Sequence, residues 1–584
     1  MQNIKTTFLF ILSIFRPYKL YIIGLLAIEL VWAINSSARP YLVKIIVDSL
    51  DYNNFNASSP IAKSFLLFTV LSIIQVFLFR ISDYLYAKMM PFVIKDTILR
   101  CFKRVNRLPY LYFKDTFGGS IASNIYETAD SLEYIFNTLI YRLIARILVF
   151  VIACLTISLI IDKSLAILLF SAFFILSIFN FYLARAPYKL AKLHMESYVI
   201  LIGNLVDSIV NMLSVILLSG RKYEYKHINE KASAEAINRQ KVQFSMLYIE
   251  LGNSLFLVLI NLLCFMYSIY LYKEQLITIG DITFILLMMI NLSDILRNIE
   301  RDILRFLENF GKCVQTLKLI ETVQIATDKK SATSINIKLG NIEFRKVSFG
   351  YTKDKILFNE LSLKIYSNQK IVCLGHSGSG KSTFVDLILK LFPINSGAIL
   401  IDDQNIDTVI QNSLYPSISL IPQDPILFNR SIFENIIYGS PNASKKEVIT
   451  ASKMALAHDF IINLPCGYNT IVGERGEKLS GGQRKLIAIA RVMLKNNKIL
   501  IVDELTSNLD IISRHRLKSS MKKFIQNKTV ISISHSIEDA LDADRILLFE
   551  KGCIVADGNH KELLKTNKFY KNFYCDTYHD KSIT

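Results

Sequence analysis

Paired cysteines are missing from this sequence of 584 residues. Its eight cysteines are scattered, and none has the spacing of a CxxC pair or of a metal site. This absence argues against a disulfide framework and a zinc site, so we interpret the cysteines as reduced and structural. The N-terminal segment also lacks a small-residue cleavage site behind its short apolar stretch, Phe8 to Phe15. It therefore fits an amphipathic helix on a membrane surface better than a signal peptide.

Long apolar runs are absent after about residue 310, but they fill the chain before it. The whole sequence is 52% hydrophobic, more than soluble proteins usually show. A membrane helix needs ~20 predominantly apolar residues. Six stretches come close to that length: Tyr21 to Val47, Phe65 to Tyr86, Ile140 to Ile161, Ser164 to Leu183, Gly252 to Tyr272 and Ile279 to Leu296. The sequence predicts a six-helix transmembrane domain over residues 1–328.

Acidic residues are fewer than basic ones, 49 against 67, which gives a formal net charge of +18. The basic residues gather in the long connections between spans two and three and between spans four and five. Because basic loops resist translocation, both connections and both termini are expected in the cytoplasm. Topology thus accounts for much of the charge, and no nucleic-acid partner is expected. High Ile, Lys and Asn usage points to an AT-rich bacterial genome, hence to a bacterial inner membrane.

The two basic connections show helical periodicity, which indicates that helices continue beyond the bilayer as long cytoplasmic extensions. A polar linker, residues 329–337, follows the membrane part. Residues 338–584 contain short β-rich runs separated by helices, with no repeat of about 20 to 50 residues. This pattern predicts an α/β domain after the linker.

A glycine-rich loop lies between an apolar strand, Lys370 to Leu374, and an apolar helix, Phe384 to Leu391. In this context the backbone N–H groups of the loop can wrap phosphates at a helix N-terminus. We expect Lys381 to reach the β- and γ-phosphates of ATP, and the Ser382 hydroxyl to bind Mg²⁺. The residues predicted to bind ATP here are Gly375, Ser377, Gly378, Ser379, Gly380, Lys381, Ser382 and Thr383.

A second strand, Lys498 to Val502, ends in two carboxylates. Asp503 is expected to hold Mg²⁺, and Glu504 to polarise the attacking water. Taken alone, such a pair is more often the solvated acidic end of an ordinary buried strand. A third motif, Ser480-Gly481-Gly482-Gln483, opens a helix and forms another anion site. A chain with one phosphate loop has no obvious use for a second anion site. If two chains were arranged head to tail, each could close this motif over the ATP of the other.

Together these motifs resemble the ABC transporter family, and the resemblance covers essentially the whole chain. More closely, the chain looks like an exporter-type half-transporter, similar to lipid A flippases and multidrug exporters, with six spans fused ahead of one P-loop ATPase domain of ABC type. The resemblance implies adenine stacking on Tyr351, a Mg²⁺ contact at Gln423, and γ-phosphate contacts at His535. It also implies that Asp510 and Ser480 to Gln483 act on ATP held by a second chain.

The resemblance also identifies two coupling segments, Leu108 to Phe113 and Val206 to Gly220, as sites of short helices. It leaves the partner open, because a homodimer and the intact half of a heterodimer would share these residues; the homodimer is our expectation. An ATP-gated channel or receptor is a less favoured alternative. Gating needs no efficient hydrolysis, whereas this chain keeps both Glu504 and His535.

Charged residues within membrane spans are costly and usually face a cavity or a partner. The candidates for substrate contact are Arg80, Arg142, Arg146 and Arg297. Such a basic ring resembles that of bacterial lipid A flippases. The resemblance favours a lipid or lipid-linked glycan as the amphiphilic substrate, with a multidrug or peptide exporter as the alternative. An equally weighted interpretation pairs Arg80 with Asp83, and Arg297 with Asp294, within their own helices.

Overall fold

A computed structural model describes residues 2–50, 60–115, 118–183, 185–321, 332–352, 355–505, 511–534, 536–571 and 574. The chain divides into two compact units. The first, which we call the helical unit, comprises Met1–Leu108 and Thr116–Val323. The second, the α/β unit, comprises Pro109–Asp115 and Gln324–Thr584. The predicted linker lies partly outside the described residues, so its bounds stay a prediction.

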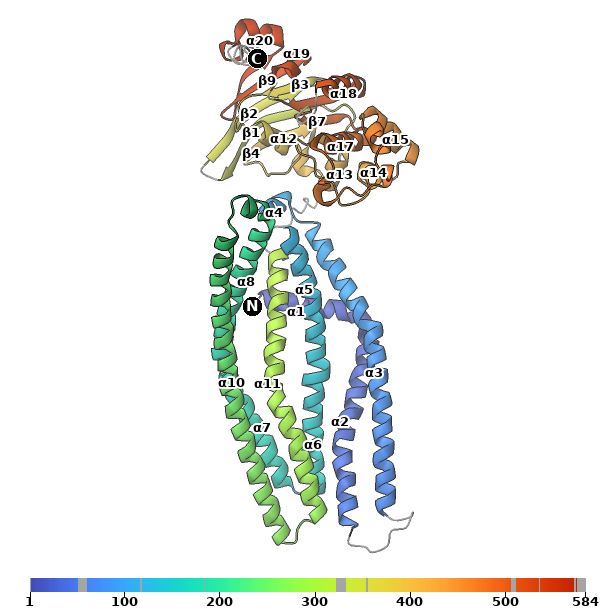
Figure 1. Ribbon diagram of the computed structural model, residues 1–584, viewed down its shortest axis with the longest axis vertical. Helices are drawn as coiled ribbons and strands as arrows, with labels where there is room; N and C mark the ends of the chain where they lie inside the picture. Colours follow the sequence, from blue (N-terminus) through green and yellow to red (C-terminus); the bar gives the residue numbers. More distant parts are fainter. Residues whose placement is uncertain are drawn as a thin grey trace. The chain divides into compact units, whose positions relative to one another are not determined.

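Long helices build the helical unit, and Figure 1 shows them running side by side. The longest, α10, has 53 residues, or about 80 Å at 1.5 Å per residue. That length exceeds the ~30 Å hydrocarbon core of a bilayer, as the predicted cytoplasmic extensions require. The helices are α1 (Gln2–Phe15), α2 (Lys19–Asp48), α3 (Pro60–Val105), α5 (Gly118–Asn137), α6 (Ala145–Ile160), α7 (Lys163–Leu183), α8 (Arg185–Val210), α9 (Met212–Leu217), α10 (Arg221–Lys273) and α11 (Ile279–Glu321).

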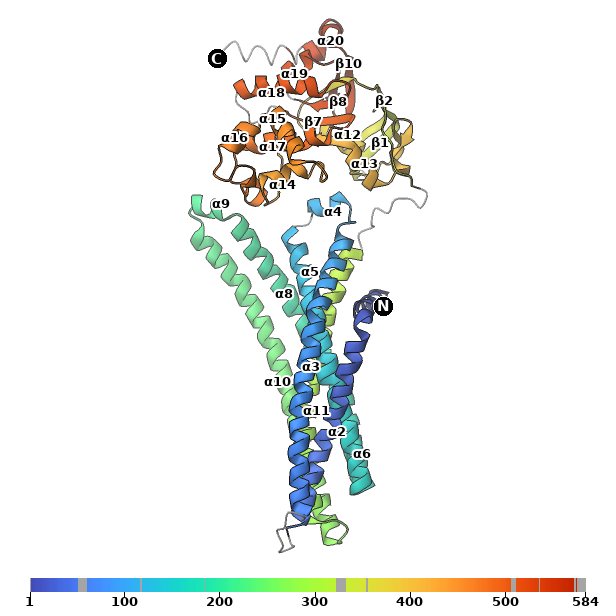
Figure 2. The ribbon, with the colours of Figure 1, turned by 90° about the vertical axis from the view of Figure 1, so that its right-hand side faces the viewer.

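The two expected short helices are present. Helix α4 (Tyr110–Asp115) overlaps the first coupling segment and ends two residues beyond it. Helix α9 lies within the second, where Figure 2 shows it at the turn between α8 and α10. A 3-10 turn, η1 (Arg16–Tyr18), joins α1 to α2. A π-helical turn, η2 (Thr138–Ile144), joins α5 to α6.

Six helical segments of the described chain are long and apolar enough to cross a membrane. Five of them contain or overlap predicted spans. The sixth, Lys189–Val210, belongs to a connection predicted to be cytoplasmic, and the described part of α11, which holds the predicted span Ile279 to Leu296, is not among the six. The two segments differ in burial. Helix α11 buries Phe284, Ile285, Met288 and Leu292 in the main apolar cluster of this unit, whereas no residue of Lys189–Val210 is buried.

Two sheets form the α/β unit. A six-stranded sheet has the order β10-β9-β3-β8-β7-β6 and is parallel from β9 to β6. A four-stranded antiparallel sheet has the order β2-β1-β4-β5. The strands are β1 (Ile342–Thr352), β2 (Lys355–Ile365), β3 (Lys370–Leu374), β4 (Ser396–Ile401), β5 (Gln404–Asn405), β6 (Ile418–Ile421), β7 (Ile499–Asp503), β8 (Thr529–Ile533), β9 (Arg545–Glu550) and β10 (Cys553–Gly558).

The helices of this unit are shorter than those of the helical unit. Several are directly preceded by a serine whose side chain caps the first turn, including α14, α15 and α17. They are α12 (Lys381–Ile388), α13 (Gln411–Ser417), α14 (Ile432–Ile437), α15 (Lys445–Met454), α16 (His458–Ile462), α17 (Gly481–Lys495), α18 (Ile511–Phe524), α19 (Ile537–Leu541) and α20 (His560–Thr566). Three 3-10 turns complete the set: η3 (Ile406–Thr408), η4 (Gly467–Asn469) and η5 (Glu474–Gly476).

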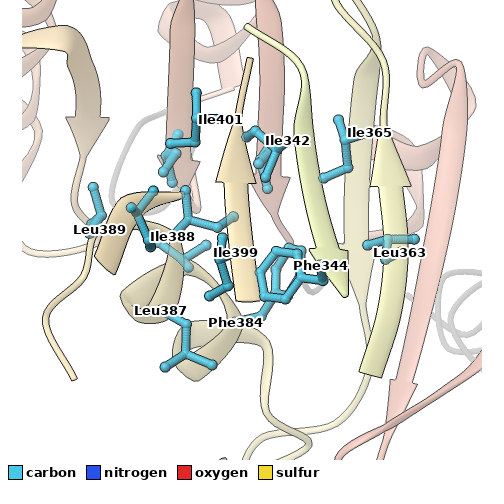
Figure 3. Packing of buried hydrophobic residues seen from close by; sticks show 14 of the residues in the cluster. Ile342, Phe344, Leu363, Ile365, Phe384, Leu387, Ile388, Leu389, Ile399 and Ile401 are labelled. Atoms are coloured by element: carbon cyan, nitrogen blue, oxygen red, sulfur yellow. The ribbon is translucent and has the colours of Figure 1, made fainter. Parts of the chain in front are cut away.

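Helix α12 is fixed by the apolar core between the sheets. Phe384 on α12 stacks on Phe344 of β1, with ring centroids 4.8 Å apart, and both side chains are fully buried. Ile388 and Ile399 belong to the same cluster (Figure 3). Because α12 begins at Lys381, this packing also holds the end of the glycine-rich loop in place.

Candidate functional site

The glycine-rich loop connects β3 to α12, and three of its glycines have backbone torsions that other residues rarely adopt. Gly375, Gly378 and Gly380 have φ values of +142°, +79° and +109°. A Cβ on Gly375 would lie 2.3 Å from the carbonyl oxygen of Phe549, whereas one on Gly378 would meet no atom within 4 Å. The loop is thus tightly packed against Phe549 at Gly375. It is open at Gly378, where a phosphate could approach the backbone.

Lys381 begins α12 and is buried, with its ammonium turned back onto the loop. Its Nζ donates to the carbonyl oxygens of Gly375 at 2.6 Å and of His376 at 2.9 Å. Burial lowers the pKa of Lys381, and nearby Asp503 and Glu504 oppose that shift. The Ser382 side chain is exposed, and Ser379 Oγ is buried without a hydrogen-bond partner among the described residues. These polar groups fit the phosphates and Mg²⁺ of a nucleotide.

The carboxylates emerge at the same edge of the sheet. Strands β3, β7 and β8 run parallel in register, with Asp503 beside Ile533 and Ile533 beside Cys373. Glu504 follows directly, and its Oε2 accepts a hydrogen bond of 2.9 Å from Nε2 of Gln423, just beyond the end of β6. The structure therefore brings together the carboxylate expected to polarise the attacking water and the amide to which the resemblance assigns a Mg²⁺ contact.

Tyr351 lies near the first turn of α12. Its hydroxyl is 2.8 Å from Thr383 Oγ1, and its ring packs edge-on against Phe349 and Phe392. The side chain nevertheless stays 54% exposed. A ring that is held at its edges and remains exposed can offer a face for stacking.

Ser480 caps helix α17 in a reciprocal arrangement. The Gln483 backbone N–H donates to Ser480 Oγ at 3.2 Å, and the Ser480 N–H donates to Gln483 Oε1 at 3.0 Å. Gly481 and Gly482 form the first turn, where free backbone N–H groups and the helix dipole favour an anion. The predicted second anion site is therefore a well-formed helix N-terminus.

Known families match both parts of the chain. The ABC transporter family matches residues 358–507, and the ABC transporter transmembrane region matches residues 21–295. The chain is an ABC transporter. It is a half-transporter of the exporter type, in which the membrane region is fused to an ATPase, and the predicted fold class and ATPase activity coupled to transport are confirmed. The predicted sixth span falls within the matched membrane region up to residue 295.

Relatives extend this similarity. The chain is 33% identical over 373 residues to an ATM1-type heavy metal exporter of Novosphingobium aromaticivorans, covering 63% of this chain and 61% of the relative. It is 29% identical to the putative multidrug export ATP-binding/permease protein YgaD of Bacillus subtilis, covering 96% and 97%. The solved structure of a bacterial Atm1-family ABC exporter with ATP bound aligns with a TM-score of 0.90 and 25% identity, covering 96% of this chain and 98% of the other.

Three of the predicted residues lie beyond what the structure describes. Asp510 and His535 are outside the described residues, and nothing is described of the Arg297 side chain. Their assigned roles in this ABC transporter remain predictions.

The other candidate substrate residues have acidic partners. Arg80 pairs with Asp83 at 3.0 Å on an exposed face of α3, which is the pairing within one helix that the sequence offered as an alternative. Arg142 contacts Asp302 Oδ1 at 3.0 Å, and Arg146 contacts Oδ2 of the same buried carboxylate. Sequence reasoning missed Asp302, because 160 and 156 residues separate it from these arginines.

Lys485 is a second residue that sequence reasoning missed. Its Nζ donates to the backbone carbonyl oxygens of Glu504 and Gln423. The only sequence signal was a lysine at the start of an apolar helical stretch, which by itself does not identify a partner.

Proposed function

We propose that two copies of this chain form a homodimer in which each ATP lies between the phosphate loop of one copy and Ser480 to Gln483 of the other. The observation that carries the hydrolytic role is the contact between Gln423 and Glu504 at the edge of the sheet where the phosphate loop begins. The second copy is inferred from the capped helix N-terminus at Ser480, an anion site for which a single phosphate loop has no obvious use. A carboxylate hydrogen-bonded to an amide at this edge is well suited to orient a water against a γ-phosphate.

Within that site each residue has a distinct task. Backbone N–H groups from Gly375 to Gly380 and the Lys381 ammonium bind the phosphates, and Tyr351 supports the adenine. Glu504 orients the water whose oxygen attacks the γ-phosphorus as the bond to the ADP oxygen breaks, with Asp510 and His535 completing the site. Ser382, Gln423 and Asp503 would hold Mg²⁺, which neutralises charge on the phosphate oxygens.

ATP binding favours the closed pair of α/β units, and hydrolysis returns them to the open state. Such a cycle shifts the helical units between inward-open and outward-open arrangements, because ATP binds one state more tightly than the other. The protein would lie in a bacterial inner membrane with both termini and the ATPase in the cytoplasm, as the basic connections indicate.

The substrate we propose is a hydrophobic or amphiphilic drug-like compound. Relatives named multidrug and heavy metal exporters support this alternative better than the lipid or lipid-linked glycan that the sequence favoured. The lipid hypothesis depended on a ring of free arginines. Because Arg80, Arg142 and Arg146 each have a carboxylate partner, fewer cationic donors remain for a phosphorylated headgroup.

The test of the ATPase assignment is Glu504→Gln in the full chain, reconstituted in liposomes. We expect ATP turnover to fall by at least about 100-fold while ATP binding persists, because the amide cannot act as the carboxylate does. Turnover at the wild-type rate would remove Glu504 from the mechanism. A panel of drugs and lipids, scored for stimulation of ATPase activity and for movement between leaflets, tests the substrate class.

A further inference from the structure

Helix α17 carries a buried lysine close to the proposed hydrolytic site. Lys485 lies five residues after Ser480, and its side chain is 1% exposed. Lysine is almost never fully buried unless its ammonium is paired. The identity of its partners therefore indicates what the buried charge does.

Those partners are the backbones of the two residues at the centre of the proposed function. Lys485 Nζ donates to the carbonyl oxygen of Glu504 and, at 3.4 Å, to the carbonyl oxygen of Gln423. The side chains of Gln423 and Glu504 contact each other as well, at 2.9 Å. The three residues thus form a closed ring of contacts that joins α17 to the ends of β6 and β7.

The backbone of Glu504 needs such support. Its φ is +49°, in the left-handed region that residues with a side chain rarely adopt. The Glu504 N–H donates to the carbonyl oxygen of Ile533 at 3.0 Å, and the Glu504 carbonyl oxygen accepts from Lys485. One anchor comes from the neighbouring strand, and the other comes from α17.

The charges around Lys485 favour the same arrangement. Burial lowers the pKa of the Lys485 ammonium, while the carboxylates of Glu504, Asp424 and Asp503 oppose that shift. The lysine therefore lies among acidic groups at the sheet edge rather than in an apolar part of the core.

Two other lysines of the α/β unit show what an ordinary structural role looks like. Lys495, at the end of the same helix, donates to the carbonyl oxygens of Tyr415 and Ile418, each at 2.6 Å. Lys528 donates to Asn496 Oδ1 and to the carbonyl oxygen of Asn497. Both tie chain segments together, but neither holds a residue assigned to ATP. Lys485 differs because its partners, Glu504 and Gln423, are residues assigned to the ATP site.

We propose that Lys485 is a positioning residue for ATP hydrolysis, which fixes the backbone of Glu504 and Gln423 and joins them to the helix that begins at Ser480. The inference rests on the proposed function of that site. It gives each chain a mechanical link between the helix N-terminus directed at the partner's ATP and the carboxylate directed at its own ATP.

The experiment compares Lys485→Met with Lys495→Met in the full chain reconstituted in liposomes, with ATPase activity measured over a range of ATP concentrations. We expect Lys485→Met to lower kcat about 10- to 100-fold, because small displacements of catalytic groups have effects of that order. KM for ATP should stay within about twofold. Lys495→Met, which removes the same kind of contact from the same helix, should leave kcat within about twofold.

Two further variants separate positioning from folding. Lys485→Gln keeps an N–H donor and should recover part of the lost kcat. In a double-mutant cycle, Lys485→Met should lower the residual rate of Glu504→Gln much less than it lowers the wild-type rate, because both changes act on one carboxylate. If Lys485→Met does not accumulate, Lys485→Ala and Lys495→Ala replace the first pair.

Equal kcat values for the Lys485 and Lys495 variants would overturn the inference, as would independent, multiplicative losses in the cycle. Failure of the proposed function has a different signature. If Glu504→Gln turns over at the wild-type rate, the role of Glu504 is wrong whatever Lys485 does. If Glu504→Gln loses ATP turnover and Lys485→Met has the same kcat as Lys495→Met, only the role of Lys485 is wrong.

Discussion

The helical unit and the α/β unit both bury apolar cores, but the helical unit leaves many more of its large apolar side chains exposed. In the helical unit large apolar side chains point outward, for example Leu159 at 83% exposure and Leu20 at 75%. In the α/β unit Phe344, Phe358 and Phe384 are fully buried between the sheets and α12. The difference follows from the solvent of each unit, because lipid accepts apolar surface that water expels.

The prediction with the largest effect compares a glycine of the phosphate loop in the α/β unit with a glycine inside a helix of the helical unit. Gly375→Ala places a Cβ 2.3 Å from the Phe549 carbonyl oxygen at a φ of +142°, so the phosphate loop cannot keep its shape. We expect ATP turnover to fall by at least about 100-fold, as measured in liposomes.

Gly203 on α8 is the matched control in the helical unit, since a Cβ there meets no atom within 4 Å. Gly203→Ala should leave turnover unchanged and raise stability by about 0.5–1 kcal/mol, the usual gain from removing a glycine inside a helix. Near-normal turnover of Gly375→Ala would mean that the loop tolerates a shift.

The second prediction concerns the buried carboxylate of the helical unit. Asp302→Ala leaves Arg142 and Arg146 without their shared partner. We expect a loss of about 3 kcal/mol, the lower end of the range for a broken buried pair, because the two arginine side chains are 41% and 21% exposed. Thermal unfolding in detergent should show this loss. In the α/β unit the exposed pair Lys522–Asp542 serves as the reference, and Asp542→Ala should have no measurable effect. A stable Asp302→Ala protein would show that the arginines have sufficient other partners.

The third prediction exchanges one exposed isoleucine for lysine in each unit. Ile175 on α7 is 57% exposed and Ile356 on β2 is 64% exposed, so burial alone does not distinguish them. If α7 faces lipid, Ile175→Lys should cost about 2.5–3.5 kcal/mol of insertion free energy. Ile356→Lys should change stability by no more than about 0.5 kcal/mol. The amount of membrane-inserted protein and its unfolding temperature would be measured for both variants. Equal effects would contradict the expectation that Ile175 faces lipid while Ile356 faces water.

Much of this architecture could be predicted from the sequence, because it depends on local spacing. The phosphate loop needs Gly375, Lys381 and Ser382 within a few residues, after one strand and before one helix. The spans need only ~20 apolar residues each. The order of these segments along the chain is characteristic enough to identify the family. Residues within one helical turn, such as Arg80 and Asp83, could also be paired from spacing alone.

The contacts around Glu504 and Asp302 could not be predicted from the sequence, because they join residues from different elements of the chain. Asp302 meets Arg142 across 160 residues, and Gln423 meets Glu504 across 81. Even Lys485 and Glu504, only 19 residues apart, come from a helix and the end of the following strand. Apolar periodicity predicts that such elements are buried, but not which carbonyl or carboxylate a buried charge will meet. The sequence by itself therefore determined an ATP-driven exporter. The tertiary structure decided which residues hold the backbone of Glu504 and which buried carboxylate contacts Arg142 and Arg146. Such pairings depend on the angles and registers at which whole helices and strands pack.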